Sequence, residues 1–88
     1  MLKIQRTVNG DETVLKLSGR MDAENVAELE TQFASEPKGR RMTLDLEDLT
    51  LASREAVRFL ERCESDSIKL VSCPLYIRDW ILRERKAK

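Results

Sequence analysis

The segment Leu44–Leu60, LDLEDLTLASREAVRFL, contains the change of hydrophobic period that decides the fold. Its first half alternates apolar and polar residues, which is typical of a strand with one buried face. From Ala56 onwards the apolar residues recur at helical spacing, and Ser53 is a residue type favoured at a helix N-cap. The segment therefore predicts a strand, a short crossing and a helix. A helix start exposes backbone NH groups, so this junction is a favoured place for anions and regulatory chemistry in α/β proteins.

Two strands and a hairpin turn are predicted ahead of this segment. Residues 2–8 alternate apolar and polar side chains, and residues 13–18 form a second largely apolar run. Asn9-Gly10 lies between them, and both residue types tolerate the positive φ of a tight turn. The two strands are therefore expected to pair antiparallel, and the second is expected to end at Gly19.

A first helix is predicted after the second strand. Asp22 is a residue type favoured at the N-cap, because its carboxylate accepts hydrogen bonds from NH groups of the first turn. The apolar residues up to about Glu36 recur with helical spacing, and Pro37 and Gly39 are expected to end the helix.

The chain after this helix is predicted to add two more strands. They are expected over Arg41–Leu46 and Ile68–Val71, on either side of the helix that Ser53 caps. Leu49 and Leu51 are interpreted as carrying the chain over the end of the sheet. The wet face of the second helix is expected to be charged, with the residues Arg54, Glu55, Arg58, Glu61, Arg62 and Glu64.

A last helix is predicted after Pro74. Its inward face is expected to hold Ile77, Trp80 and Ile81, whereas Tyr76 lies off this stripe and is expected to be exposed. The charged end of the helix is expected to be solvated and to complement the helix dipole, with a partner-binding role as the alternative; it consists of Arg83, Glu84, Arg85, Lys86 and Lys88.

Together these elements predict an α/β fold in the order β-β-α-β-α-β-α, with residues 1–88 as a single domain. A strand-helix-strand connection usually returns parallel and right-handed, so the four-stranded sheet is expected to be mixed. One-sided alternation in the strand over residues 41–46 predicts helices mainly on one face of the sheet.

The charge balance argues against nucleic acid as a partner, and the hydropathy of the chain argues against a membrane span. The chain has 16 basic and 16 acidic residues and a formal net charge of zero, so it has no general attraction for nucleic acid. No stretch is apolar enough for a membrane span or a secretion signal, so a cytoplasmic protein without direct membrane insertion is expected. The oligomeric state is not predicted.

The residue types present predict neither an enzyme nor a cofactor or metal site. The chain has no histidine, no glycine-rich phosphate loop and no arrangement of nucleophile, base and acid. Cys63 and Cys73 are expected to be free thiols, and two thiolates alone do not complete a zinc site. Cys63 lies on an apolar helix stripe and is expected to be inert. Cys73 stands beside a helix start, which can depress the pKa of a thiol, although a structural role is preferred.

Two long stretches resemble the STAS domain, the module of anti-sigma factor antagonists and of the cytoplasmic tails of sulfate transporters. They are VLKLSGRMDAENVAELE, over residues 14–30, and MTLDLEDLTLASREAVRFL, over residues 42–60, and they occur in the order and at the spacing of the family. The ending IKLVSCPLYIRDWILRE extends the resemblance over most of the chain. It implies a bacterial regulatory protein that works by binding other proteins.

The resemblance also implies a switch position that this chain has altered. Anti-sigma factor antagonists usually carry Asp-Ser-Ser-Gly after the third strand, and a partner kinase phosphorylates the second serine. Here Ser53 matches the aspartate, Arg54 the first serine, Glu55 the phosphorylated serine and Ala56 the glycine. The phospho-acceptor is therefore missing, and the usual serine switch is expected to be absent.

Three interpretations of this loop remain open. In the first, Ser53 caps the helix, Glu55 complements the helix dipole and Arg54 is a solvated side chain. In the second, Glu55 is a permanent negative charge in place of the phosphate, with less charge and fewer acceptor atoms. In the third, Ser53 is itself phosphorylated.

The function predicted from these residues is a non-enzymatic protein-interaction module that resembles anti-sigma factor antagonists. Its partner-binding surface is expected to consist of Asp22, Ser53, Arg54, Glu55 and Arg58. An anti-sigma factor or a related kinase is the expected type of partner. The alternative is a soluble STAS accessory subunit of a membrane transporter system. Ligand sensing is a third option, but no residue pattern in the sequence marks a ligand pocket.

Overall fold

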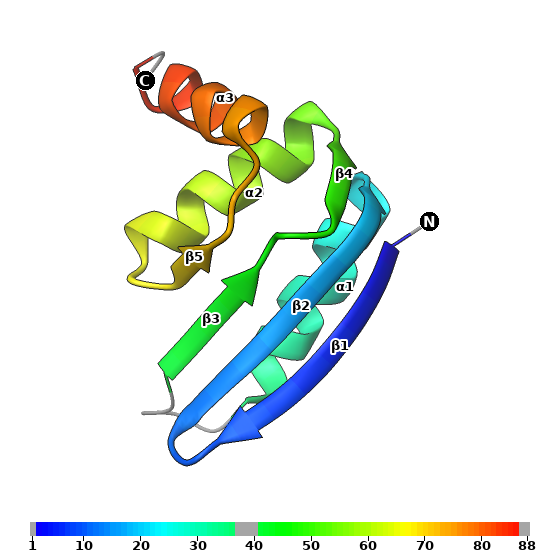
Figure 1. Ribbon diagram of the computed structural model, residues 1–88, viewed down its shortest axis with the longest axis vertical. Coiled ribbons are helices and arrows are strands. Elements are labelled where there is room, and N and C mark those ends of the chain that lie inside the picture. The colour runs from blue at the N-terminus through cyan, green and yellow to red at the C-terminus, as the bar shows by residue number, and fades with distance from the viewer. Residues whose placement is uncertain (1, 37–40, 87–88) are drawn as a thin grey trace.

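The computed structural model describes residues 2–36 and 41–86 of the 88-residue chain. Its elements, in chain order, are β1 (Leu2–Asn9), β2 (Glu12–Met21), α1 (Ala23–Ser35), β3 (Arg41–Asp45), β4 (Leu49–Ala52), α2 (Arg54–Ser65), β5 (Lys69–Val71) and α3 (Leu75–Lys86). The predicted α/β class and the mixed sheet are confirmed (Figure 1). The predicted helix stop at Pro37 and Gly39 lies outside the described residues.

The sheet is built around β2. Strand β1 pairs with it antiparallel, β3 pairs with its first half in parallel, and β5 pairs in parallel with the outer side of β3. The hairpin turn lies where the sequence predicts it, with Asn9 paired to Glu12 and a positive φ of 60° at Gly10. A positive φ is strained for most residues other than glycine and asparagine, which explains why position 10 is a glycine.

The prediction of four strands is wrong, because the sheet has five strands within residues 2–36 and 41–86 alone. Strand β3 ends at Asp45, and the chain returns to β2 as the short strand β4, where the sequence predicts only a crossing. Strand β2 also continues past the predicted stop at Gly19, with a register shift between Gly19 and Arg20. Gly19 has a φ of 94°, and its NH donates to the carbonyl of Asp48 at 3.0 Å. This irregularity lets one strand pair with two successive segments.

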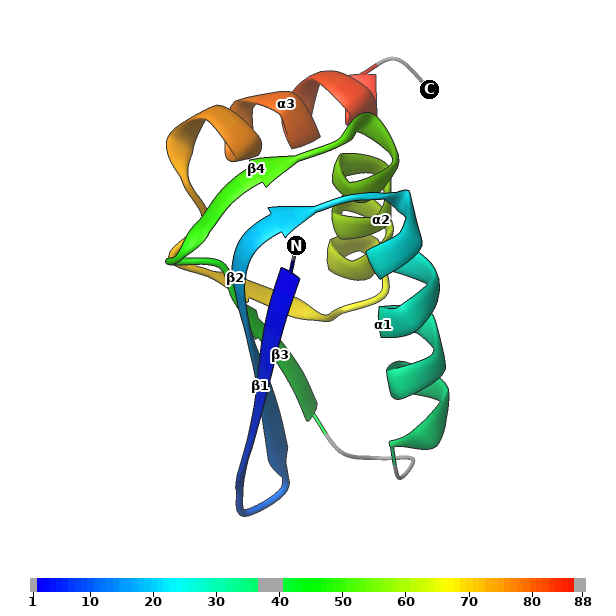
Figure 2. The ribbon, with the colours of Figure 1, turned by 90° about the vertical axis from the view of Figure 1, so that its right-hand side faces the viewer.

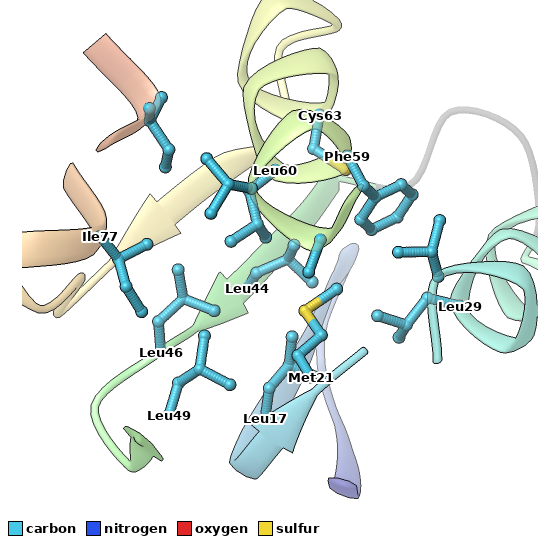
Figure 3. Packing of buried hydrophobic residues seen from close by; sticks show 14 of the residues in the cluster. Leu17, Met21, Leu29, Leu44, Leu46, Leu49, Phe59, Leu60, Cys63 and Ile77 are labelled. Atoms are coloured by element: carbon cyan, nitrogen blue, oxygen red, sulfur yellow. The ribbon is translucent and has the colours of Figure 1, made fainter. Parts of the chain in front are cut away.

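Helices α1 and α2 lie on the same side of the sheet, as predicted, and α3 lies across the end that carries β4 (Figure 2). The rings of Phe33 and Phe59 stack with their centroids 5.7 Å apart and join α1 to α2. Ile77 of α3 points toward Leu46 and Leu60 in the core (Figure 3).

The inward and outward residues of α3 follow the prediction. Ile77 and Ile81 are fully buried, Trp80 packs half-buried against the core, and Tyr76 is exposed. In the part of the chain that the structure describes, every helix is too short or too polar to cross a membrane.

Candidate functional site

The start of α2 is held in place by Ser53. Its Oγ accepts a hydrogen bond from the NH of Ala56 at 3.2 Å, and its own NH donates to the carbonyl of Met21 at 2.9 Å. The first bond satisfies a backbone donor that the helix leaves unpaired, and the second ties the cap to the end of β2. Ser53 is therefore a half-buried structural cap, as the first interpretation of the loop expects.

Asp22 has the corresponding position at the start of α1. Its NH donates to Oδ1 of Asn25 at 2.9 Å, which supports the first turn. Its carboxylate lies 3.2 Å from Nε of Arg20; the arginine side chain is 62% exposed and the aspartate side chain 43%. The predicted N-cap position is confirmed.

A groove of about 680 Å³ lies beside the first turns of α1 and α2. It brings together three of the predicted site residues, Arg54, Glu55 and Arg58. Asp22 and Ser53 are the chain neighbours of lining residues but do not line the groove themselves. The full lining consists of Ala23, Val26, Arg54, Glu55, Arg58, Glu61, Arg62 and Glu84.

One carboxylate in the lining of this groove pairs with two guanidinium groups. Oε1 of Glu84 lies 3.2 Å from Nε of Arg54 and 3.5 Å from Nε of Arg58. The side chain of Glu84 is only 10% exposed, whereas those of Arg54 and Arg58 are 64% and 55% exposed. The positive charges therefore face solvent and the negative charge lies beneath them. Arg54 is not simply solvated, which corrects that part of the first interpretation.

Sequence reasoning missed Glu84, which it placed in the solvated end of the last helix. The available signal was spacing, because Glu84 follows Ile77 by seven residues and Ile81 by three and so falls on the inward stripe. An acidic residue on an inward stripe requires a cationic partner from the facing element. Helix α2 supplies two.

Further ion pairs join α2 to α3 and correct two other expectations. Glu61, predicted on the wet face, is only 3% exposed, and its Oε1 lies 3.6 Å from Nε of Arg85. Glu64 accepts from Arg78 at 2.8 Å and from Arg85 at 2.6 Å. Burial opposes ionisation of Glu64, but these hydrogen bonds outweigh it and lower its pKa. The charged end of α3 is thus partly a docking element for α2.

Glu55 is exposed at the groove, as Arg54 and Arg58 are, but it carries the opposite charge. It lies in the first turn of α2, where a negative charge interacts favourably with the helix dipole. The position that the resemblance gives to the family's phosphoserine is therefore an accessible carboxylate in the groove lining.

The two cysteines are free thiols, and the structure corrects one expectation about them. Burial raises the pKa of Cys63 to about 12, which agrees with the predicted inert thiol. Burial also raises the pKa of Cys73, so the depressed pKa that its place near a helix start suggested is wrong.

Alkylation of the native protein is expected to be slow at both thiols. At roughly pH 8 both have less thiolate than a free cysteine, because both pKa values are raised. Cys73 is half-buried and should react more slowly than in the unfolded chain, and buried Cys63 should react only through local opening. Mass spectrometry of iodoacetamide-treated peptides measures both rates, with the protein in concentrated guanidinium as the control. Native Cys73 reacting faster than in the unfolded control would contradict this account.

No protein-family model matches this sequence, and no curated protein matches it. Solved structures do match. The structure of Mglu superimposes with a TM-score of 0.61 and 17% identity over 75% of this chain. The matched region is only 18% of the Mglu chain, so this chain spans a small part of that protein's length. The anti-sigma-factor antagonist STAS domain from Rhodobacter sphaeroides superimposes with a TM-score of 0.54 and 13% identity, over 81% of this chain and 86% of that one. The protein therefore has a STAS-like fold.

Proposed function

We propose that residues 1–88 form one STAS-like domain that acts as a non-enzymatic protein-interaction module. Its partner-contact surface is the groove lined by Arg54, Glu55 and Arg58 and bordered by Asp22 and Ser53. The observation that carries the proposal is the unequal burial of opposite charges at this groove. Two exposed guanidinium groups share one buried carboxylate, so the surface offers hydrogen-bond donors that the fold itself does not use up.

The groove favours a partner segment with acidic and apolar residues. Guanidinium groups bind carboxylates in a planar, directional way, so Arg54 and Arg58 are suited to an acidic side chain of the partner. Ala23 and Val26 supply an apolar part of the lining. Glu55 adds an exposed carboxylate at one side, and it would repel a partner whose charge pattern does not match.

The contact is proposed to be permanent and not switched by a serine. Glu55 carries one negative charge, whereas a phosphoserine carries about −1.5 to −2 and three acceptor oxygens. The Ser53 hydroxyl is used as a helix cap. Such a module stays competent to bind at all times, and any switching of the complex occurs through changes in the partner.

Replacing Glu55 with lysine is expected to weaken partner binding at least tenfold, which corresponds to about 1.4 kcal/mol. The protein should stay folded, because an exposed residue of the first helical turn contributes at most about 1 kcal/mol. The measurement is affinity capture from the native cell with wild-type and Glu55→Lys protein, followed by peptide identification and binding titration with the protein retained by the wild type.

Glu24→Lys is the matched control for this substitution. Glu24 is an exposed acid in the first turn of α1, but it does not line the groove. Both variants have the same change in net charge, so a general charge effect would weaken them equally. Undiminished binding by Glu55→Lys would refute the groove as the contact surface. The identity of the captured protein separates a kinase or anti-sigma factor from a transporter subunit.

A further inference from the structure

Helix α3 has an outer face that points away from the helix packed beneath it. Figures 1 and 2 both show α3 at the edge of the molecule, with α2 on its inner side. Leu75, Asp79, Leu82 and Lys86 follow one another at intervals of four, three and four residues, and therefore lie on one side of the helix. Residues on the opposite side, such as Ile77 and Ile81, are buried. We call the four residues, with Tyr76 and Arg83 at their flank, the outer face of α3.

The outer face exposes more apolar surface than its length explains. Leu75 is 87% exposed, Tyr76 49% and Leu82 43%. Five large hydrophobic side chains are exposed in the described part of the chain, and these three of them belong to the 12-residue helix α3. Single exposed apolar residues are ordinary, whereas several on one face mark an interaction surface.

The charges of the outer face are arranged with a direction along the helix. Its one acidic residue, Asp79, precedes the basic residues Arg83 and Lys86. Asp79 and Arg83 form an ion pair at 2.9 Å within the helix, but their side chains are 59% and 77% exposed and both remain open to a second partner. A parallel copy of this helix would meet like charges. An antiparallel copy would meet opposite charges at both ends of the contact.

We propose that the outer face of α3 pairs with the same face of a second copy, antiparallel and about a two-fold axis. In this arrangement Asp79 of each copy faces the basic end of the other helix. Leu82 packs against the partner helix near the axis, and Leu75 covers the aliphatic part of a basic side chain. The self-complementary charge pattern is what selects a second copy over another occupant.

The expected dimer is weak. A helix of 12 residues is about 18 Å long, so one helix pair buries less surface than the roughly 1,200–2,000 Å² of a stable complex. We expect a dissociation constant on the order of 10–100 µM. The outer face borders the Glu55 groove, because Arg54 and Glu84 line that groove and also a second hollow with Tyr76, Asp79 and Arg83. The dimer proposal does not rest on the proposed function, since Leu75, Leu82 and Lys86 line neither hollow.

Sedimentation equilibrium between roughly 5 and 500 µM tests the proposal, since this range brackets the expected dissociation constant. The apparent mass should rise from the chain mass of 10.2 kDa toward twice that value. Leu82→Glu should remain monomeric at every concentration, with an unchanged circular dichroism spectrum. A wild-type protein that stays monomeric at the highest concentration would overturn the proposal and leave the face to a different partner.

A charge exchange tests the antiparallel arrangement. Asp79→Arg alone should raise the dissociation constant at least tenfold, because it places like charges opposite each other in both halves of the contact. Adding Arg83→Asp to the same chain should restore dimerisation, since the introduced guanidinium of each copy would then face the introduced carboxylate of the other. A dimer that is unaffected by the single change, or not restored by the double change, contradicts this pairing.

Discussion

Replacing Leu60 with alanine is expected to lower the free energy of unfolding by about 2–5 kcal/mol, the usual range for a leucine deleted from a closed core. Leu60 is fully buried, and Figure 3 shows it within the core that Leu44 and Ile77 also enter. The substitution opens a cavity where α2, the sheet and α3 meet. Urea unfolding followed by circular dichroism measures the loss.

Leu51→Ala is the control for this change. Leu51 is 57% exposed on β4, so the same atoms are removed without leaving a closed cavity. The expected loss is below about 1 kcal/mol. Equal losses for the two variants would show that Leu60 does not hold α2, the sheet and α3 together.

The second large effect concerns the charges between α2 and α3. Changing Arg54 and Arg58 together to methionine is expected to cost about 3 kcal/mol, because Glu84 remains buried without a cation. Methionine keeps much of the aliphatic packing, so the loss reports mainly on charge. Glu84→Gln should cost less, about 1 kcal/mol, since the two exposed guanidinium groups it leaves behind are solvated.

Chemical denaturation measures the free energy of unfolding of both variants, and the double arginine variant should lose more than Glu84→Gln. A larger loss of stability for Glu84→Gln than for the double arginine variant would contradict the view that Glu84 is the buried partner of Arg54 and Arg58. The result also bears on the choice of binding probes. Arg54 and Arg58 stabilise the fold, so Glu55 is the cleaner site for testing the groove.

The elements that could be predicted from the sequence are those whose patterns are local. The turn at Gly10, the caps at Asp22 and Ser53, and the inward residues of α3 all follow from spacing or residue type over a few positions. The segment Leu44–Leu60 is a strand-to-helix junction, as its pattern predicts. The prediction for its middle is wrong, because β4 is only 4 residues long and exists through pairing with β2. Such pairing across the sheet leaves little local pattern.

The candidate site was predictable in position but not in its electrostatics. Arg54, Glu55 and Arg58 follow from the helix start and from the resemblance, and the structure places them in one groove. The role of Glu84 depends on α3 packing against α2, a contact between residues 30 apart in the sequence. The pKa of Cys73 likewise depends on tertiary packing, because burial raises it. A position beside a helix start does not reveal this burial, although the structural role preferred for Cys73 agrees with it.

The most direct test of the central claim, that the groove is a protein-contact surface, is photo-crosslinking in the native cell. Ala23 is exposed and lines the groove, whereas Ala27, one turn further along α1, is exposed and does not line it. A photoreactive phenylalanine analogue at position 23 should form a discrete adduct with one partner protein, and the same residue at position 27 should not. Adducts of equal yield at both positions, or at position 27 alone, would contradict the account.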